Sequence, residues 1–181
     1  MVKHYFISIL FIFLIKLNGS TISLTISEDL INNYLNTVGE YKYYSKKSKS
    51  EWLIKNPHVK IQNDEIIFFS KVVYKEGLIN IRKDVKRILK VKYDLKKNIV
   101  KLVFKNSILY MERKGKRLNM LDLKDLYEPK LLFSGPNLKT KSFRLNLTKR
   151  RKIFINPNFA EIILKENNIE LILDVSFKEK F

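Results

Sequence analysis

The chain of 181 residues is long enough for one domain with a substantial core, and its lack of cysteine excludes disulfides and thiolate metal sites. It carries 36 lysines and arginines against 18 aspartates and glutamates, a formal net charge of +18 at pH 7. Such a balance indicates either an anionic partner or solvated basic faces in a composition biased toward lysine, isoleucine and asparagine.

An apolar run from Tyr5 to Ile15, interrupted only by Ser8, follows the basic start of the chain. It has about half of the roughly 20 residues that a transmembrane helix needs, and its length is typical of the apolar region of a signal peptide. We therefore expect residues 1–20 to be a secretory signal peptide, with a buried strand or helix as the alternative. The protein is then exported, to the periplasm or outer envelope if its source is bacterial.

The expected mature chain, residues 21–181, begins with two clear patterns. Residues 21–26 alternate in polarity, which predicts a strand. Residues 27–36 predict a short amphipathic helix, because Ser27 suits its N-cap and apolar residues recur at helical spacing. Residues 39–51 are polar, basic and rich in tyrosine, which predicts a loop.

The middle of the chain predicts a series of amphipathic strands. Residues 65–75 have apolar side chains on one face, and residues 89–104 alternate on both sides of a turn, which is typical of a hairpin. The predicted inner faces of these strands carry the large side chains of Phe68, Tyr74, Tyr93 and Phe104.

The last third of the chain predicts short helices at 118–126 and 159–167, followed by a final strand at 169–177 with Leu173 and Phe177 on its apolar face. Taken together, residues 21–181 predict a single α+β domain. Its core element is a long, strongly curved and mostly antiparallel sheet, accompanied by one or two short helices.

Few residues indicate catalysis or metal binding. The mature chain would hold one histidine, His58, and it has neither cysteine nor a nucleophile-elbow motif. Three carboxylate pairs would have to serve a hydrolase, but each also fits a helix or a turn: Glu28 with Asp29, Asp64 with Glu65, and Asp122 with Asp125. We therefore expect no enzyme, no metal site and no cofactor.

Two basic clusters are candidates for contact with an anionic surface. Lys46 and Lys47 lie among tyrosines, and neighbouring like charges need solvent or an anion. Tyrosine and lysine are both favourable at a membrane interface, whereas export argues against nucleic acid as the ligand. The second cluster comprises Lys149, Arg150, Arg151 and Lys152, expected between two strands.

The strand TISLTI followed by SEDLINNYLN resembles the start of small exported bacterial proteins of the tubular lipid-binding (TULIP-like) type. The resemblance implies a curved antiparallel sheet with a groove for acyl chains and no catalytic residues. That family usually has a long helix lying in the curved sheet, whereas this chain offers only the short candidates at 27–36 and 159–167.

Two functional hypotheses follow. In the first, a non-enzymatic protein binds a lipid or other apolar ligand near an anionic envelope membrane, through Phe68, Tyr74, Tyr93, Phe104, Leu173 and Phe177. In the second, an envelope structural or interaction protein has a filled core, and its basic surface contacts anionic polymers or a partner protein. An open apolar groove would favour the first hypothesis, and a filled sheet interior would favour the second.

Overall fold

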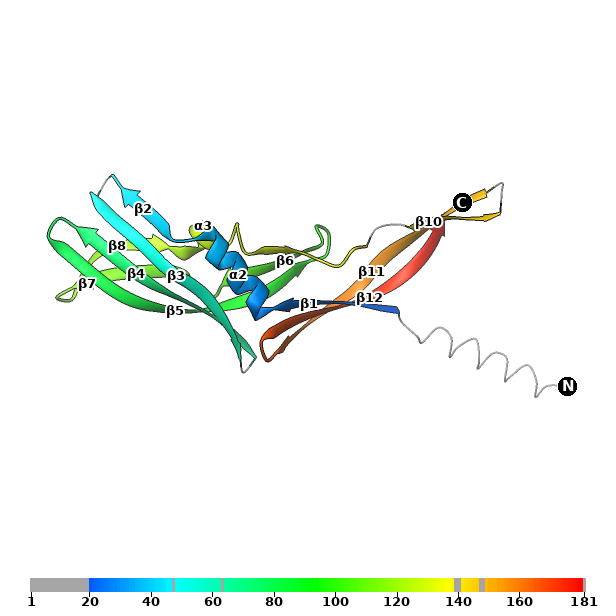
Figure 1. The fold of residues 1–181 in the computed structure, drawn as a ribbon, viewed down its shortest axis with the longest axis horizontal. Helices are drawn as coiled ribbons and strands as arrows, with labels where there is room; N and C mark the ends of the chain where they lie inside the picture. Colours follow the sequence, from blue (N-terminus) through cyan, green and yellow to red (C-terminus); the bar gives the residue numbers. More distant parts are fainter. Residues whose placement is uncertain (1–19, 47, 63, 139–140, 147–148, 181) are drawn as a thin grey trace. The chain divides into compact units, whose positions relative to one another are not determined.

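The computed structural model describes residues 20–46, 48–62, 64–138, 141–146 and 149–180. This part of the chain is mostly antiparallel sheet, with one strongly curled half-barrel sheet and two short helices (Figure 1). The predicted fold class is therefore confirmed. Residues 1–19, which make up nearly all of the expected signal peptide, lie outside the described residues.

The chain divides into two compact units. The first contains the described parts of residues 1–24, 136–161 and 171–181, and the second contains the described parts of residues 25–135 and 162–170. Most of a four-stranded sheet in the order β1-β12-β11-β10 forms the first unit, whereas the end of β1 and the hairpin end at residues 162–170 belong to the second. These strands are β1 (Ser20–Ser27), β10 (Lys141–Asn146), β11 (Lys149–Lys165) and β12 (Asn168–Lys180).

Strand β11 replaces the helix that we expected at residues 159–167. The strand continues to Lys165, and a tight turn at Glu166 and Asn167 leads directly into β12. Asn167 has a φ of 61°, a left-handed conformation that asparagine tolerates well in turns. Pairing with β12 and the β-branched isoleucines at 162–163 favour the strand, so local helical spacing misled the prediction.

The second unit contains a six-stranded sheet in the order β2-β3-β4-β5-β6-β9 and a separate β7–β8 hairpin. Antiparallel pairing joins each strand to its neighbour. The strands are β2 (Tyr41–Ser45), β3 (Ser50–Gln62), β4 (Glu65–Glu76), β5 (Ile79–Asp94), β6 (Ile99–Phe104), β7 (Ile108–Arg113), β8 (Lys116–Asp122) and β9 (Leu132–Ser134). The helices are α2 (Glu28–Val38) and α3 (Leu123–Tyr127).

The predicted hairpin at residues 89–104 is confirmed as the junction of β5 and β6, where Tyr93 pairs with Val100. The predicted loop at 39–51 is wrong in part, because it contains β2. Its tyrosines suit a strand, and backbone pairing with β3 stabilises it despite its charge.

Helix α2 begins where the sequence predicts. The hydroxyl Oγ of Ser27 accepts a hydrogen bond from the backbone N–H of Leu30 at 3.1 Å, which caps the first turn. Ile31 and Leu35 are fully buried, and the helix packs on β3. The prediction of an amphipathic helix at residues 27–36 is therefore confirmed.

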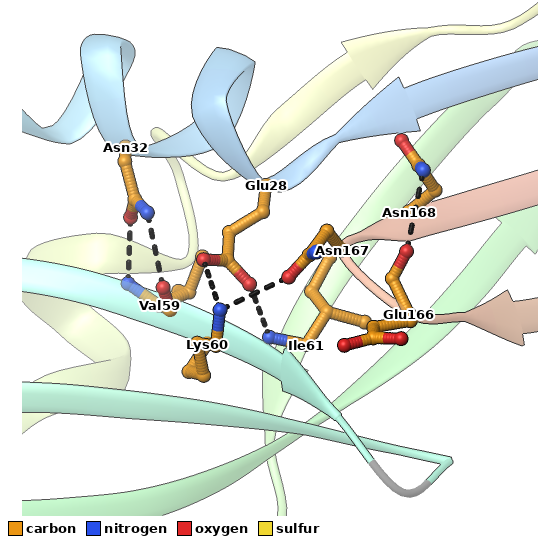
Figure 2. Close-up of polar contacts among 8 residues, drawn as sticks. All are labelled: Glu28, Asn32, Val59, Lys60, Ile61, Glu166, Asn167 and Asn168. Carbon is orange, nitrogen blue, oxygen red and sulfur yellow. Dashed lines mark hydrogen bonds and ion pairs between the residues drawn. The ribbon is translucent and has the colours of Figure 1, made fainter.

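Side chains of α2 cover the edge of β3 that β2 leaves free. The β2 pairing ends at Ile54, and Pro57 lacks a backbone N–H that would need a partner. Val59 donates its N–H to Oδ1 of Asn32 at 2.7 Å, and Nδ2 of Asn32 donates to the Val59 carbonyl at 3.0 Å (Figure 2). The carboxylate of Glu28 accepts the N–H of Ile61 at 2.7 Å.

The turn between β11 and β12 provides further hydrogen-bond partners for this edge of β3. The backbone N–H of Asn167 donates to the Ile61 carbonyl at 3.2 Å, and its carbonyl accepts the N–H of Glu28 at 2.8 Å. Lys60 bridges the carboxylate of Glu28 at 3.1 Å and the side-chain oxygen of Asn167 at 3.0 Å (Figure 2). The helix start, the β3 edge and the hairpin turn are thus joined by polar contacts.

Aromatic side chains fill the inner face of the six-stranded sheet. Trp52 lies against Tyr74, with ring centroids 4.8 Å apart. Phe68 contacts Phe104 at 5.3 Å and Tyr127 of α3 at 5.1 Å. Edge-to-face and tilted ring pairs of this kind add about 0.5–1.5 kcal/mol to the free energy of area burial. Helix α3 therefore contributes directly to this core.

Candidate functional site

Alternation along β4 separates the two faces of the six-stranded sheet. Phe68, Val72 and Tyr74 face the core and are fully buried, whereas Lys71 and Lys75 occupy alternate positions and are exposed. We call the surface that carries these two lysines the outer face. It is opposite the aromatic core described above.

Strand register gathers basic residues of three strands on the outer face. Lys71 of β4 pairs with Lys55 of β3 and with Asp84 of β5, and Lys75 pairs with Asn80 of β5. A hollow of about 570 Å³ lies over this region. We call it the basic hollow, and the charged residues that line it are Lys55, Lys71, Lys75, Arg82, Lys83 and Asp84.

The floor of the basic hollow includes apolar side chains. Leu53 and Val73 are cross-strand neighbours, both are half-buried, and Val73 also pairs with Arg82. A ligand in the hollow would therefore meet aliphatic carbon below and cationic groups around the rim.

Positive charge in the basic hollow exceeds the available negative charge. Lys55 forms an ion pair with the exposed carboxylate of Glu40 at 3.5 Å. Among the residues that the structure describes, Lys71, Lys75 and Arg82 form no ion pair. These exposed cations remain available to an anion from solution.

The same face carries one close charge pair beside the hollow. Lys42 of β2 contacts Glu51 of β3 at 2.6 Å, and their hydrogen bond lowers the pKa of the Glu51 carboxyl. The positive charges of Lys42 and Lys75 lower this pKa further. Glu51 thus partly balances Lys75, and Asp84 is the cross-strand neighbour of Lys71, although Lys71 and Asp84 form no ion pair in the described part of the chain.

The apolar residues proposed from the sequence occupy different environments. Phe68 and Tyr74 are fully buried against other rings, while Tyr93 and Phe104 are half-buried on the same inner face. The hydroxyl of Tyr93 donates to Oδ1 of Asn98 at 2.6 Å, and burial raises the pKa of Tyr93.

The other two proposed apolar residues belong to the first unit. Leu173 is fully buried in β12, in line with the predicted alternation, whereas Phe177 is 55% exposed near the end of the same strand. The structure therefore brings Phe68 and Phe104 into contact and places Leu173 and Phe177 in a separate unit.

The structure describes the two basic clusters proposed from the sequence only in part. Lys46 is exposed in the turn between β2 and β3, and Lys47 lies outside the described residues. The backbone of residues 149–152 belongs to β11, where Arg151 pairs with Phe143 of β10. The side chains of Lys149, Arg150, Arg151 and Lys152 lie outside what the structure describes.

Sequence reasoning missed the basic hollow. Lys71 and Lys75 occupy the polar positions of the predicted strand 65–75. Alternation alone therefore predicts that they share one face of this strand. Their proximity to Lys55 and Arg82 depends on the pairing of three strands, which the sequence does not specify.

One of the carboxylate pairs considered for a hydrolase lines a second, smaller hollow. Asp122 and Asp125 border about 290 Å³ together with Tyr43 and Met120. The carboxylate of Asp122 accepts the backbone N–H of Lys124 at 2.9 Å and so caps α3. This contact gives Asp122 a structural role at the helix start.

In the described part of the chain, no helix has the length and apolar character needed to cross a membrane. Within the same residues, no three His, Cys, Asp or Glu side chains gather into a group that could hold a metal ion. Comparison of the chain with protein families, curated proteins and solved structures found no match.

Proposed function

We propose that this chain is a non-enzymatic interaction protein whose basic hollow contacts an anionic polymer or an acidic partner protein. The observation that supports the proposal best is the set of exposed cations, Lys71, Lys75 and Arg82, without an ion-pair partner among the described residues. Export from the cytoplasm remains part of the proposal and rests on the apolar run at Tyr5–Ile15.

The spacing of the cations favours an extended ligand over a single small anion. Lys71 and Lys75 share one face of β4 and are four residues apart, which places their Cα atoms about 13 Å from each other along the strand. Arg82 lies on the neighbouring strand. A phosphate-sized anion cannot contact all of these groups at once, whereas a polymer or an acidic protein surface can.

The packing of the inner face supports this proposal over the apolar-ligand hypothesis. Phe68 and Tyr74 would have to face a bound lipid, yet each is fully buried against the rings of other residues. Their apolar area is therefore already used in stabilising the fold.

The test compares two triple variants with the same change in net charge. Lys71→Ser/Lys75→Ser/Arg82→Ser removes cations from the basic hollow, and Lys96→Ser/Lys116→Ser/Lys124→Ser removes exposed lysines elsewhere. Binding of poly-L-glutamate is measured for both by isothermal titration calorimetry at several salt concentrations. Binding of the chain to vesicles with and without anionic lipid is measured in parallel. This measurement tests whether a membrane surface supplies the negative charge.

Each cation near an anionic surface contributes about 1 kcal/mol, so loss of three should weaken binding about 100-fold. We expect that loss for the hollow variant and a clearly smaller loss for the control variant. Equal losses would mean that net charge alone attracts polyanions, and the proposal would then be wrong. Binding to anionic vesicles without binding to poly-L-glutamate would also contradict it.

A further inference from the structure

One long edge of the six-stranded sheet is open. Strand β5 pairs with β4 from Ile79 to Leu89, but its pairing with β6 begins only at Leu89. The carbonyl of Ile88 accepts the N–H of Lys105 at 2.9 Å, which fixes the direction in which even-numbered residues of β5 point their backbone groups. The backbone groups of Asn80, Arg82, Asp84 and Lys86 therefore point away from β4.

These groups lack backbone partners in the part of the chain that the structure describes. The carbonyl of Lys86 accepts a hydrogen bond from the guanidinium of Arg87 at 2.9 Å. The backbone N–H and carbonyl of Asn80, Arg82 and Asp84 have no hydrogen-bond partner among the described residues. The β3 edge, by contrast, is covered by Asn32, Glu28 and Asn167. The open edge of β5 is a template for another extended chain.

Hollows lie on both sides of this edge. Asn80, Arg82 and Asp84 line the basic hollow on the outer face. Ile81 and Arg87 line a third hollow, of about 240 Å³, on the other side. Lys83 lines both the basic hollow and this third hollow, and β7 supplies Tyr110, Met111 and Glu112 to the third hollow. A strand added to β5 would direct alternate side chains toward the two hollows.

The side chain of Arg87 links β5 to β7. Its Nη2 donates to the carbonyl of Ile108 at 3.2 Å, and β7 pairs instead with β8. Strand β7 therefore lies near β5 but does not pair with its open edge.

The charged side chains of β5 favour an acidic strand as the partner of the open edge. Arg82, Lys83, Lys86 and Arg87 give it a positive balance against Asp84. A second copy of β5 would bring the same cations together, which disfavours pairing between identical chains. An acidic strand would place negative charge beside these cations while its backbone completes the ladder.

We infer that an extended acidic segment of a partner protein adds as a strand to β5 along Asn80–Lys86. Its acidic side chains lie over the basic hollow, and the alternate side chains lie over the third hollow, which Ile81, Lys83, Arg87, Tyr110, Met111 and Glu112 line. This inference rests on the proposed function, because it assigns a chemistry and a binding mode to the anionic partner of the basic hollow.

The test uses two acetylated, amidated peptides of identical composition. In one, Glu-Val-Glu-Val-Glu-Val-Glu, the charges alternate with apolar residues, and in the other, Glu-Glu-Val-Val-Val-Glu-Glu, they do not. Strand addition predicts that the alternating peptide binds the full chain at least about tenfold more tightly. In amide exchange measured by NMR, it should slow exchange at Asn80, Arg82, Asp84 and Lys86.

Two substitutions at one position separate the backbone from the side chain. Asp84→Pro removes an N–H that points away from β4, and Asp84→Ala keeps this N–H while removing the carboxylate. The proline variant should lose the preference for the alternating peptide, and the alanine variant should keep it. If the proline variant does not fold, slowed amide exchange in the unaltered chain decides the question.

Equal affinity for the two peptides, slowed exchange confined to another strand, or a peptide-free dimer paired through β5 in sedimentation would each overturn strand addition. These outcomes differ from failure of the proposed function, which is read from poly-L-glutamate binding by the hollow and control variants. A chain that binds poly-L-glutamate through the hollow but does not distinguish the peptides retains the proposed function and loses this inference.

Discussion

The carboxamide of Asn32 pairs with both backbone groups of Val59, accepting its N–H at 2.7 Å and donating to its carbonyl at 3.0 Å. A helix side chain thereby takes the place of a neighbouring strand. Glu28, one helical turn earlier, accepts the N–H of Ile61 in the same manner. The β3 edge is therefore closed by residues four apart on α2, whereas the β5 edge remains open.

Substitution of Asn32 should destabilise the fold, because this side chain closes part of the β3 edge. Asn32→Ala leaves the N–H and carbonyl of Val59 without partners in a partly buried setting, and we expect a loss of about 1–3 kcal/mol in the free energy of unfolding. Asn33→Ala, at an exposed position of the same helix, should change it by less than about 0.5 kcal/mol. Urea denaturation measures both, and equal effects would contradict the edge-closing role.

Two tyrosines of the core provide a second matched comparison. Tyr74 donates its hydroxyl proton to Glu76, whereas the buried hydroxyl of Tyr127 has no hydrogen-bond partner among the described residues. Tyr74→Phe should destabilise the fold by about 1 kcal/mol, and Tyr127→Phe should be neutral or slightly stabilising, because it removes an unpaired polar atom.

Titration of the two tyrosines adds an independent measurement. Burial raises the pKa of both Tyr74 and Tyr127, and the hydrogen bond to Glu76 raises that of Tyr74 further. The absorbance change of tyrosine ionisation should therefore lose a late component in either variant. A strong loss of stability in Tyr127→Phe would indicate a partner for its hydroxyl.

Phe68 and Phe177 were both proposed as ligand-binding residues. Because they differ in burial, their substitution should affect stability to very different extents. Phe68 is fully buried, so Phe68→Ala should cost about 3–5 kcal/mol through lost burial and a residual cavity. Phe177 is 55% exposed, so Phe177→Ala should reduce the free energy of unfolding by only about 1 kcal/mol. Chemical denaturation tests both, and a small effect at Phe68 would contradict its place in a packed core.

Local patterns predicted the elements whose stabilising contacts are close in sequence. The N-cap Ser27 bonds to Leu30, three residues away, and the β5–β6 hairpin pairs residues across a short turn. Both were correctly predicted, because capping and alternation leave their marks within a few neighbouring residues.

Pairing with a neighbouring strand, rather than the pattern within one segment, accounts for the errors. Residues 41–45 form a strand because β3 supplies backbone partners, and the helix expected at 159–167 is replaced by pairing with β12. The basic hollow likewise requires the register of β3, β4 and β5. Periodicity in a single segment contains none of this information.

The turn between β5 and β6 predicts a dependence of stability on pH. The carboxylate of Asp94 accepts the backbone N–H of Lys97 at 3.1 Å and contacts Nζ of Lys101 at 3.1 Å. The hydrogen bond from Lys97 is the main cause that lowers the pKa of Asp94 in the folded state, and the contact with Lys101 adds to it. A lowered carboxyl pKa stabilises the fold above the pKa of the unfolded chain, about 4, and this contribution is lost as the pH falls.

Asp94→Asn should therefore reduce the free energy of unfolding at neutral pH, and its difference from the unaltered chain should shrink as the pH falls from about 5 to about 2. Lys101→Met provides the control, because it removes the ion pair but leaves the stronger contribution from the N–H of Lys97. Urea denaturation across this pH range should show that the contribution of Asp94 to the pH dependence is mostly retained in Lys101→Met and lost in Asp94→Asn. Equal pH dependence in Asp94→Asn and the unaltered chain would show that this carboxyl does not couple folding to pH.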